Sequence, residues 1–77
     1  MDKELQPAAY PVPECPIRDA MRVAACTGCG TRTTLTAIKL IETEAGLRCA
    51  LACERNNLAR SAVIAAIRTR LQVGGTA

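Results

Sequence analysis

The chain has 77 residues and a net charge of +3, which limits it to one domain with weak attraction for nucleic acid or acidic protein surfaces. It contains no Trp, Phe or His and a single Tyr, so a core lacks aromatic burial and the usual catalytic general base is missing. No apolar run is long enough for a signal peptide or a membrane span. We therefore expect a cytoplasmic, non-enzymatic protein without a small-molecule substrate, whose core is completed by a metal or a partner.

Residues 1–15 are predicted to form a proline-rich N-terminal arm, because Pro7, Pro11 and Pro13 are excluded from helix and sheet interiors. Two interpretations of this arm are open. It is either an unstructured leader, or a segment that lies across the domain or a partner with Tyr10 as its anchor.

A short helix is predicted from Pro16 to about Ala25. Proline suits the first helical position, and Asp19 in the first turn interacts favourably with the helix dipole. Apolar residues recur at helical spacing on one stripe of this helix: Ile17, Ala20, Met21 and Ala24.

Four of the five cysteines form two pairs, Cys26-Thr-Gly-Cys29 and Cys49-Ala-Leu-Ala-Cys53. This spacing is typical of a four-thiolate zinc site, and a structural Zn²⁺ would help so short a chain to fold. The sequence therefore predicts Cys26, Cys29, Cys49 and Cys53 as zinc ligands within a single four-cysteine zinc-finger domain over residues 16–77. The alternatives are small buried cysteines in an all-helical core, a redox dithiol, or an iron–sulfur cluster. Cys15 stands apart, as a helix-cap residue, a buried thiol or a replacement ligand.

The segment between the two pairs is rich in threonine, and Thr31 to Ile41 favours a β-strand. A turn over residues 42–46 and a return strand from Leu47 would complete a hairpin that brings the pairs together. A helix over residues 33–44 is the competing interpretation, since Leu35 and Ile38 also fit helical spacing.

A C-terminal helix is predicted from about Ala50 or Asn57 to Gln72, with Asn57 as a potential N-cap. Its apolar residues form a broad face that needs cover on several sides. We expect that face to contact a partner chain through Leu58, Ile64, Ile67 and Leu71.

A knuckle, a hairpin and a helix that carries the last two ligands resemble the treble-clef or zinc-ribbon class of four-cysteine zinc fingers. Within that class, the stretch Leu40-Ile41-Glu42 to Cys53 is similar to the zinc-binding domain of bacterial Clp-type unfoldases and to small phage zinc-finger regulators of late transcription. The resemblance implies a small α+β zinc-stabilised domain with a structural metal and a binding surface.

Two functions follow from this interpretation. The first is a non-catalytic zinc-finger module that regulates or inhibits a larger protein machine by docking on it, with a homodimer as one form. The second is a nucleic-acid-binding regulator of transcription that contacts phosphates through basic side chains. Those side chains are Arg32, Lys39, Arg48, Arg55, Arg60 and Arg68.

Overall fold

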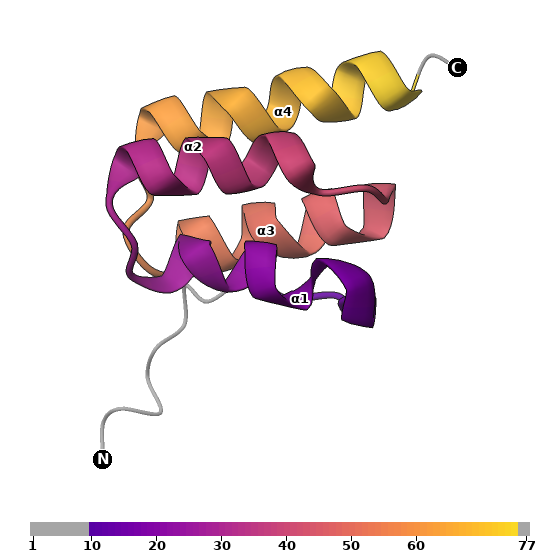
Figure 1. Cartoon of the computed structure of the whole chain (residues 1–77), viewed down its shortest axis with the longest axis horizontal. Coiled ribbons are helices and arrows are strands. Elements are labelled where there is room, and N and C mark those ends of the chain that lie inside the picture. Colours follow the sequence, from indigo (N-terminus) through magenta and orange to yellow (C-terminus); the bar gives the residue numbers. More distant parts are fainter. Residues whose placement is uncertain (1–9, 76–77) are drawn as a thin grey trace.

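A computed structural model describes residues 10–75, which form four α-helices and no strand. The helices are α1 (Ile17–Ala24), α2 (Thr31–Leu40), α3 (Glu44–Asn56) and α4 (Ser61–Gly75), and a short 3-10 helix, Ala25–Thr27, follows α1. Consecutive helices run in alternating directions (Figure 1). The predicted α+β fold with a zinc knuckle and a β-hairpin is therefore wrong. The resemblance to treble-clef zinc fingers fails with it, because that class requires the hairpin.

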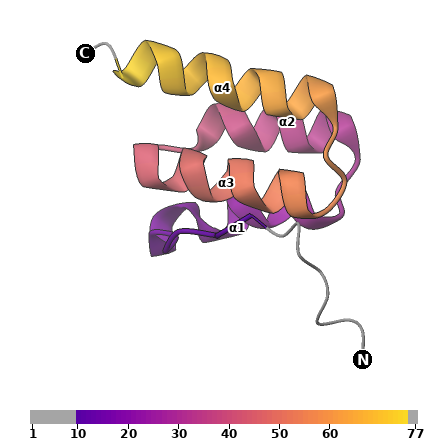
Figure 2. The same ribbon diagram turned by 180° about the vertical axis from the view of Figure 1, so that it is seen from behind.

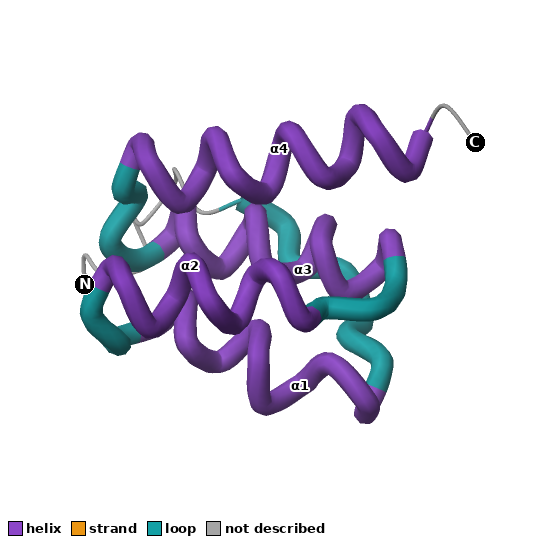
Figure 3. Tube along the Cα trace, turned by 45° about the horizontal axis from the view of Figure 1, so that its top comes forward, coloured by secondary structure: helices purple, strands orange, loops and turns teal. Residues whose placement is uncertain are grey.

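The helices form a ring in which each one packs on two others. α3 packs on α1 and α4, and α2 packs on the same two helices from the other side. α2 and α3 therefore occupy opposite corners of the bundle, as the views in Figure 2 and Figure 3 show. This arrangement leaves the outer faces of α1 and α2 next to each other on one side of the molecule.

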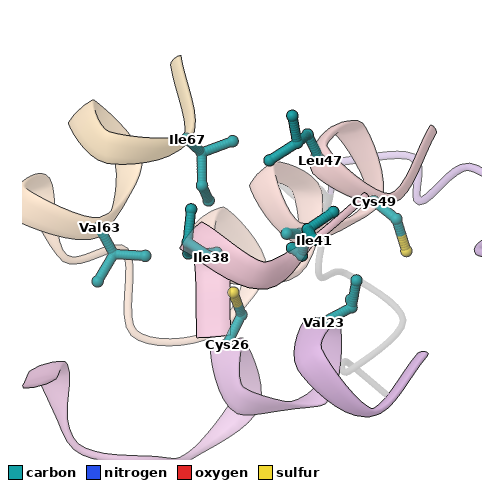
Figure 4. Close-up of a cluster of buried hydrophobic side chains, with 9 residues drawn as sticks. Val23, Cys26, Ile38, Ile41, Leu47, Cys49, Val63 and Ile67 are labelled. Atoms are coloured by element: carbon teal, nitrogen blue, oxygen red, sulfur yellow. The ribbon is translucent and has the colours of Figure 1, made fainter. Parts of the chain in front are cut away.

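The core is built from aliphatic side chains and two cysteines. Its members are Val23, Cys26, Ile38, Ile41, Leu47, Cys49, Ala50, Val63 and Ile67 (Figure 4). Tyr10, the only aromatic residue of the chain, is 46% exposed and lies outside this cluster. Branched aliphatic side chains from all four helices and the adjoining turns thus supply the burial that aromatic residues usually provide.

The segment predicted as a hairpin forms α2 and the start of α3. In α2 the side chains of Thr34 and Ile38, four residues apart, are both buried, and Leu35 between them is half-buried. The Thr34 hydroxyl donates to the carbonyl oxygens of Gly30 and Ala25, each at 3.0 Å. Burial of a stripe at helical spacing therefore outweighs the modest strand preference of threonine. The competing helical interpretation was close, although α2 begins two residues earlier and ends four residues earlier than it predicted.

Of the two predicted starts of the C-terminal helix, Ala50 is wrong and Asn57 is close, because a turn at residues 57–60 separates α3 from α4. Asn57 ends α3 instead of starting the last helix, and its side-chain amide donates to the Cys53 carbonyl at 2.7 Å. Ala59 has φ of 48°, in the left-handed region, which reverses the chain before α4. α3 and α4 then pack against each other, so most of the apolar face expected to meet a partner is covered by the chain itself.

Arg70 connects α4 to the end of α2. Its Nη1 donates to the carbonyl oxygens of Ile38 and Ile41, at 2.8 and 2.7 Å. Carbonyl groups in the last turn of a helix lack partners within that helix, so this guanidinium satisfies groups that would otherwise need water. Arg70 therefore stabilises the terminus of a neighbouring helix.

Candidate functional site

The four cysteines predicted to bind zinc do not converge. Cys26 and Cys49 are 0% and 3% exposed, and their side chains come from different elements, the turn after α1 and α3 (Figure 4). Cys29 is exposed before α2, and Cys53 is half-buried on α3. Within residues 10–75, no group of three or more Cys, His, Asp or Glu side chains is arranged to hold a metal ion. Zinc binding by this set stays a prediction, and it would require a rearrangement that brings the four thiols together.

The predicted partner-binding face of the C-terminal helix is mainly an internal surface. Ile67 is fully buried in the core, Leu71 packs on the core from its edge, and Ile64 is half-buried. Leu58 is 51% exposed, but it lies in the turn before α4. The periodicity of α4 was interpreted correctly as an apolar face, but α3 and α2 of the same chain cover it.

The basic residues predicted to contact nucleic acid do not gather on one surface. They lie on α2 (Arg32 and Lys39), on α3 (Arg48 and Arg55), in the turn before α4 (Arg60) and on α4 (Arg68). Arg48 pairs with Glu44 at 3.0 Å, and the Arg55 guanidinium lies 5.1 Å from the centre of the Tyr10 ring. Because α2 and α3 are at opposite corners of the bundle, Arg32 and Lys39 lie on a different helix and corner from Arg48 and Arg55.

Arg60 has an internal role that the sequence did not predict. Its Nε and Nη2 donate to the two carboxylate oxygens of buried Glu54, at 2.8 and 2.9 Å, and Nη1 donates to the Cys29 carbonyl at 2.6 Å. Burial opposes the charged form of Glu54, but the bonds from Arg60 outweigh it and lower the pKa of that carboxyl. This pair joins the end of α3 to the start of α2, since Nη2 also reaches the Thr34 hydroxyl at 3.1 Å.

The unusual feature of the fold is the orientation of α1. Its apolar stripe faces solvent: Ile17 and Met21 are 92% and 88% exposed, and Ala20 and Ala24 are exposed as well. The buried side of the same helix contains Asp19 and Val23. A buried carboxylate beneath an exposed apolar stripe reverses the usual pattern, and large exposed apolar side chains that adjoin one another mark interaction sites.

Asp19 explains why α1 is held in this orientation. Its Oδ1 accepts from the Glu42 amide at 2.9 Å, and its Oδ2 accepts from the Thr43 amide and hydroxyl at 3.2 and 2.6 Å. Thr43 in turn caps α3 by accepting from the Gly46 amide at 2.9 Å. Burial disfavours the charged carboxylate, but these donors and the charge of Arg22 outweigh it and lower the pKa of Asp19. The carboxylate therefore fixes the rotation of α1 about its axis.

A groove of about 620 Å³ lies between α1 and α2 beside the exposed stripe. Its apolar lining comes from Met21, Ala24, Ala25, Ala37 and Leu40, and Leu40 is 53% exposed. The charged residues that line it are both arginines, Arg22 and Arg32, and no carboxylate contributes. The groove is thus lined by small and apolar side chains together with two positive charges.

Comparisons of the chain with protein-family models, with curated proteins and with solved structures gave no match. None of the helices between residues 10 and 75 has the length and apolar content needed to cross a bilayer. The functional conclusion therefore depends on the chemistry of the α1–α2 groove and of the residues around it.

Proposed function

We propose that this chain is a non-catalytic regulatory module of the cytoplasm that docks on a protein partner through the α1–α2 groove. The occupant we assign to the groove is an amphipathic helix of another protein that carries acidic side chains beside its apolar face. The observation that carries this proposal is the apolar stripe of α1, which is exposed to solvent and adjoins the groove. The buried carboxylate of Asp19 fixes α1 in the orientation that exposes this stripe.

The shape of the groove suits a helix. Three alanines in the lining, Ala24, Ala25 and Ala37, have small side chains that allow a second backbone to approach closely, and Met21 and Leu40 provide larger apolar contacts. Helix-in-groove recognition uses apolar anchors at three- and four-residue spacing, and flexible methionine side chains adapt to such anchors. Ile17 extends the apolar surface of α1 one turn beyond Met21.

The charge of the groove selects the partner. Arg32 is exposed and forms no ion pair with any residue of the described range 10–75. Arg22 is only loosely neutralised, at 3.8 Å from Asp19 and 3.7 Å from Glu42. Carboxylates on the partner would satisfy both guanidinium groups, and opposite charge also steers encounter.

A homodimer through this groove is less favourable than an acidic partner. A two-fold interface brings the same patch of two copies together, so it would gather four arginines and no groove-lining carboxylate in one contact. Like charges placed across an interface oppose association. Nucleic acid fits the charge but not the apolar trough, since α1 and α2 offer no aromatic side chain for base stacking.

The proposal is tested with a synthetic amphipathic peptide that places Leu at three- and four-residue spacing and Glu elsewhere. Fluorescence anisotropy should detect binding to the wild-type chain, and Met21→Asp and Arg32→Glu should each weaken it by at least about tenfold, equivalent to about 1.4 kcal/mol. Leu58→Asp is the matched control, because it adds the same charge at an exposed apolar residue outside the groove. Circular dichroism confirms that each variant is folded.

Three results would overturn the proposal. One is the absence of binding, or binding that Leu58→Asp weakens as much as Met21→Asp does. The second is equal binding of a peptide with Lys in place of Glu. The third is another occupant of the groove. A wild-type dimer in sedimentation that Met21→Asp dissociates would assign the groove to a second copy, and a DNA complex that Arg32→Glu abolishes would assign it to nucleic acid.

A further inference from the structure

A cluster of thiols on the opposite side of α1 has no part in the groove. Cys49 and Cys53 are four residues apart on α3, and the Cys49 side chain interacts with those of both Cys53 and Cys15. Cys15 precedes α1 and packs against the core cluster that contains Cys49. All three are free thiols in the structure.

The segment before α1 is held along α3 at a second point. The Tyr10 amide donates to the Asn56 side-chain oxygen at 2.6 Å, and the Asn56 amide group donates to the Tyr10 carbonyl at 2.9 Å. Arg55 lies beneath the Tyr10 ring. Residues 10–16 therefore form a strap, attached to the end of α3 through Tyr10 and to its middle through Cys15. This part of the arm follows the interpretation in which Tyr10 is an anchor, whereas residues 1–9 lie outside the described residues.

We propose that Cys15 and Cys49 form a reversible disulfide that locks this strap onto α3 when a low-molecular-mass disulfide such as oxidised glutathione is present. Cys15 is the more exposed of the two, so its thiolate attacks the oxidant, forms a mixed disulfide and releases one reduced glutathione. The Cys49 thiolate then attacks the Cys15 sulfur, and the second glutathione leaves as a thiolate that takes up a proton. In total, two protein thiols are oxidised and one oxidant disulfide is reduced to two thiols.

The fold selects Cys15 over Cys53 as the partner of Cys49. Residues four apart on a helix have Cβ atoms about 5–6 Å apart, whereas a disulfide needs about 3.5–4.5 Å. A Cys49–Cys53 bond would therefore distort α3. Cys15 lies in a segment without helix or strand, so its backbone can adjust to the geometry of the bond.

The experiment treats the full chain with oxidised glutathione and digests it with trypsin under non-reducing conditions. Cleavage after Arg18 isolates the peptide that contains Cys15, and cleavage after Arg48 and Arg55 isolates the peptide that contains Cys49 and Cys53. We expect the free thiol count to fall from five to three, and these two peptides to be joined. Cys53→Ser should keep the crosslink, and Cys49→Ser should stop the reaction at the mixed disulfide.

Several results would overturn the inference. These are a crosslink within the peptide that holds Cys26 and Cys29, a Cys49–Cys53 bond, and a chain that stays singly glutathionylated at pH 9. Loss of the crosslink in Cys53→Ser with its retention in Cys49→Ser would assign the bond to Cys53. The wild-type peptide map requires no variant, so a Cys49→Ser chain that fails to fold does not weaken the test. The result is also independent of peptide binding at the groove.

Discussion

Replacing Asp19 with alanine tests the contact that holds α1 in its orientation. The carboxylate is fully buried and accepts three hydrogen bonds, two from the backbone at the start of α3 and one from the Thr43 hydroxyl. A hydrogen bond to a charged group contributes about 1.5–3 kcal/mol, and water entering the vacated space would restore part of the loss, so we expect a net destabilisation of about 3 kcal/mol. That is a large share of the roughly 5–15 kcal/mol by which domains are stable.

Gly46 provides a second perturbation at the same contact. A methyl group on Gly46 would lie 2.9 Å from the Asp19 Cβ and Cγ, and closer still to Oδ2. Overpacking of this kind costs about 1–3 kcal/mol, which outweighs the gain of about 1 kcal/mol that alanine gives in a helix. Asp19→Ala removes two of these three Asp19 atoms, Cγ and Oδ2, and keeps Cβ. In that background, Gly46→Ala should therefore lower the free energy of unfolding by at least about 1 kcal/mol less than it does in the wild type.

Urea unfolding followed by circular dichroism measures all four proteins of this double-mutant cycle. Glu14→Ala is the control, since Glu14 is an exposed carboxylate before α1. An Asp19→Ala chain as stable as the Glu14→Ala chain would refute the role of Asp19. Strictly additive effects of Asp19→Ala and Gly46→Ala would refute the close approach of the two residues.

The same carboxylate predicts how stability responds to acid. The folded-state pKa of Asp19 is below its ordinary value of 3.8, so the charged form stabilises the fold above that value and the contribution is lost as the pH falls through the folded pKa. Wild-type stability should therefore decline below about pH 4, and Asp19→Asn should show a shallower decline. Glu54, whose pKa is also lowered, maintains part of the slope in both proteins.

The remaining predictions concern the core and the thiols. Arg60→Ala should leave Glu54 buried without its partner and should lower the urea midpoint far more than Arg68→Ala, which removes an exposed arginine. Ile67→Ala should cost about 2–5 kcal/mol, and Ile67→Asp should unfold the monomer in circular dichroism instead of dissociating an assembly in sedimentation. Zinc uptake by the four predicted thiolates requires them to move together, so native mass spectrometry with one equivalent of zinc should show mainly metal-free protein, and full occupancy would contradict the placement of these thiols.

The sequence predicted some elements well because their signals are local. The helix from Pro16 to Ala25 is confirmed as α1. The apolar face of the C-terminal helix is confirmed in part: Ile67 is in the core, but Leu58 is 51% exposed and the buried Val63 was not assigned to that face. What failed was the inference from cysteine spacing to a zinc knuckle, which then favoured the hairpin over the helix. Cys26 and Cys49 instead follow the alternative of small buried residues in an all-helical core.

The candidate site was beyond sequence reasoning for a tertiary reason. The stripe that contains Ile17 and Met21 is visible in the sequence, and such a stripe is normally buried. Its exposure depends on Asp19, whose partners at residues 42 and 43 are more than twenty positions away. The one local signal for this contact was the position of Asp19 in the first turn of a short helix. A favourable interaction with the helix dipole explains an acidic residue at that position equally well.

Amide NMR of the full chain, titrated with the acidic Leu/Glu peptide, tests the docking site most directly. We predict that chemical-shift changes concentrate on α1 and α2, at residues 20–25 and 32–40, and that Met21→Asp abolishes them. Changes concentrated on α4 and the turn at residues 57–60, or a spectrum that does not change at saturating peptide, would contradict the assignment of the α1–α2 groove as the site of partner binding.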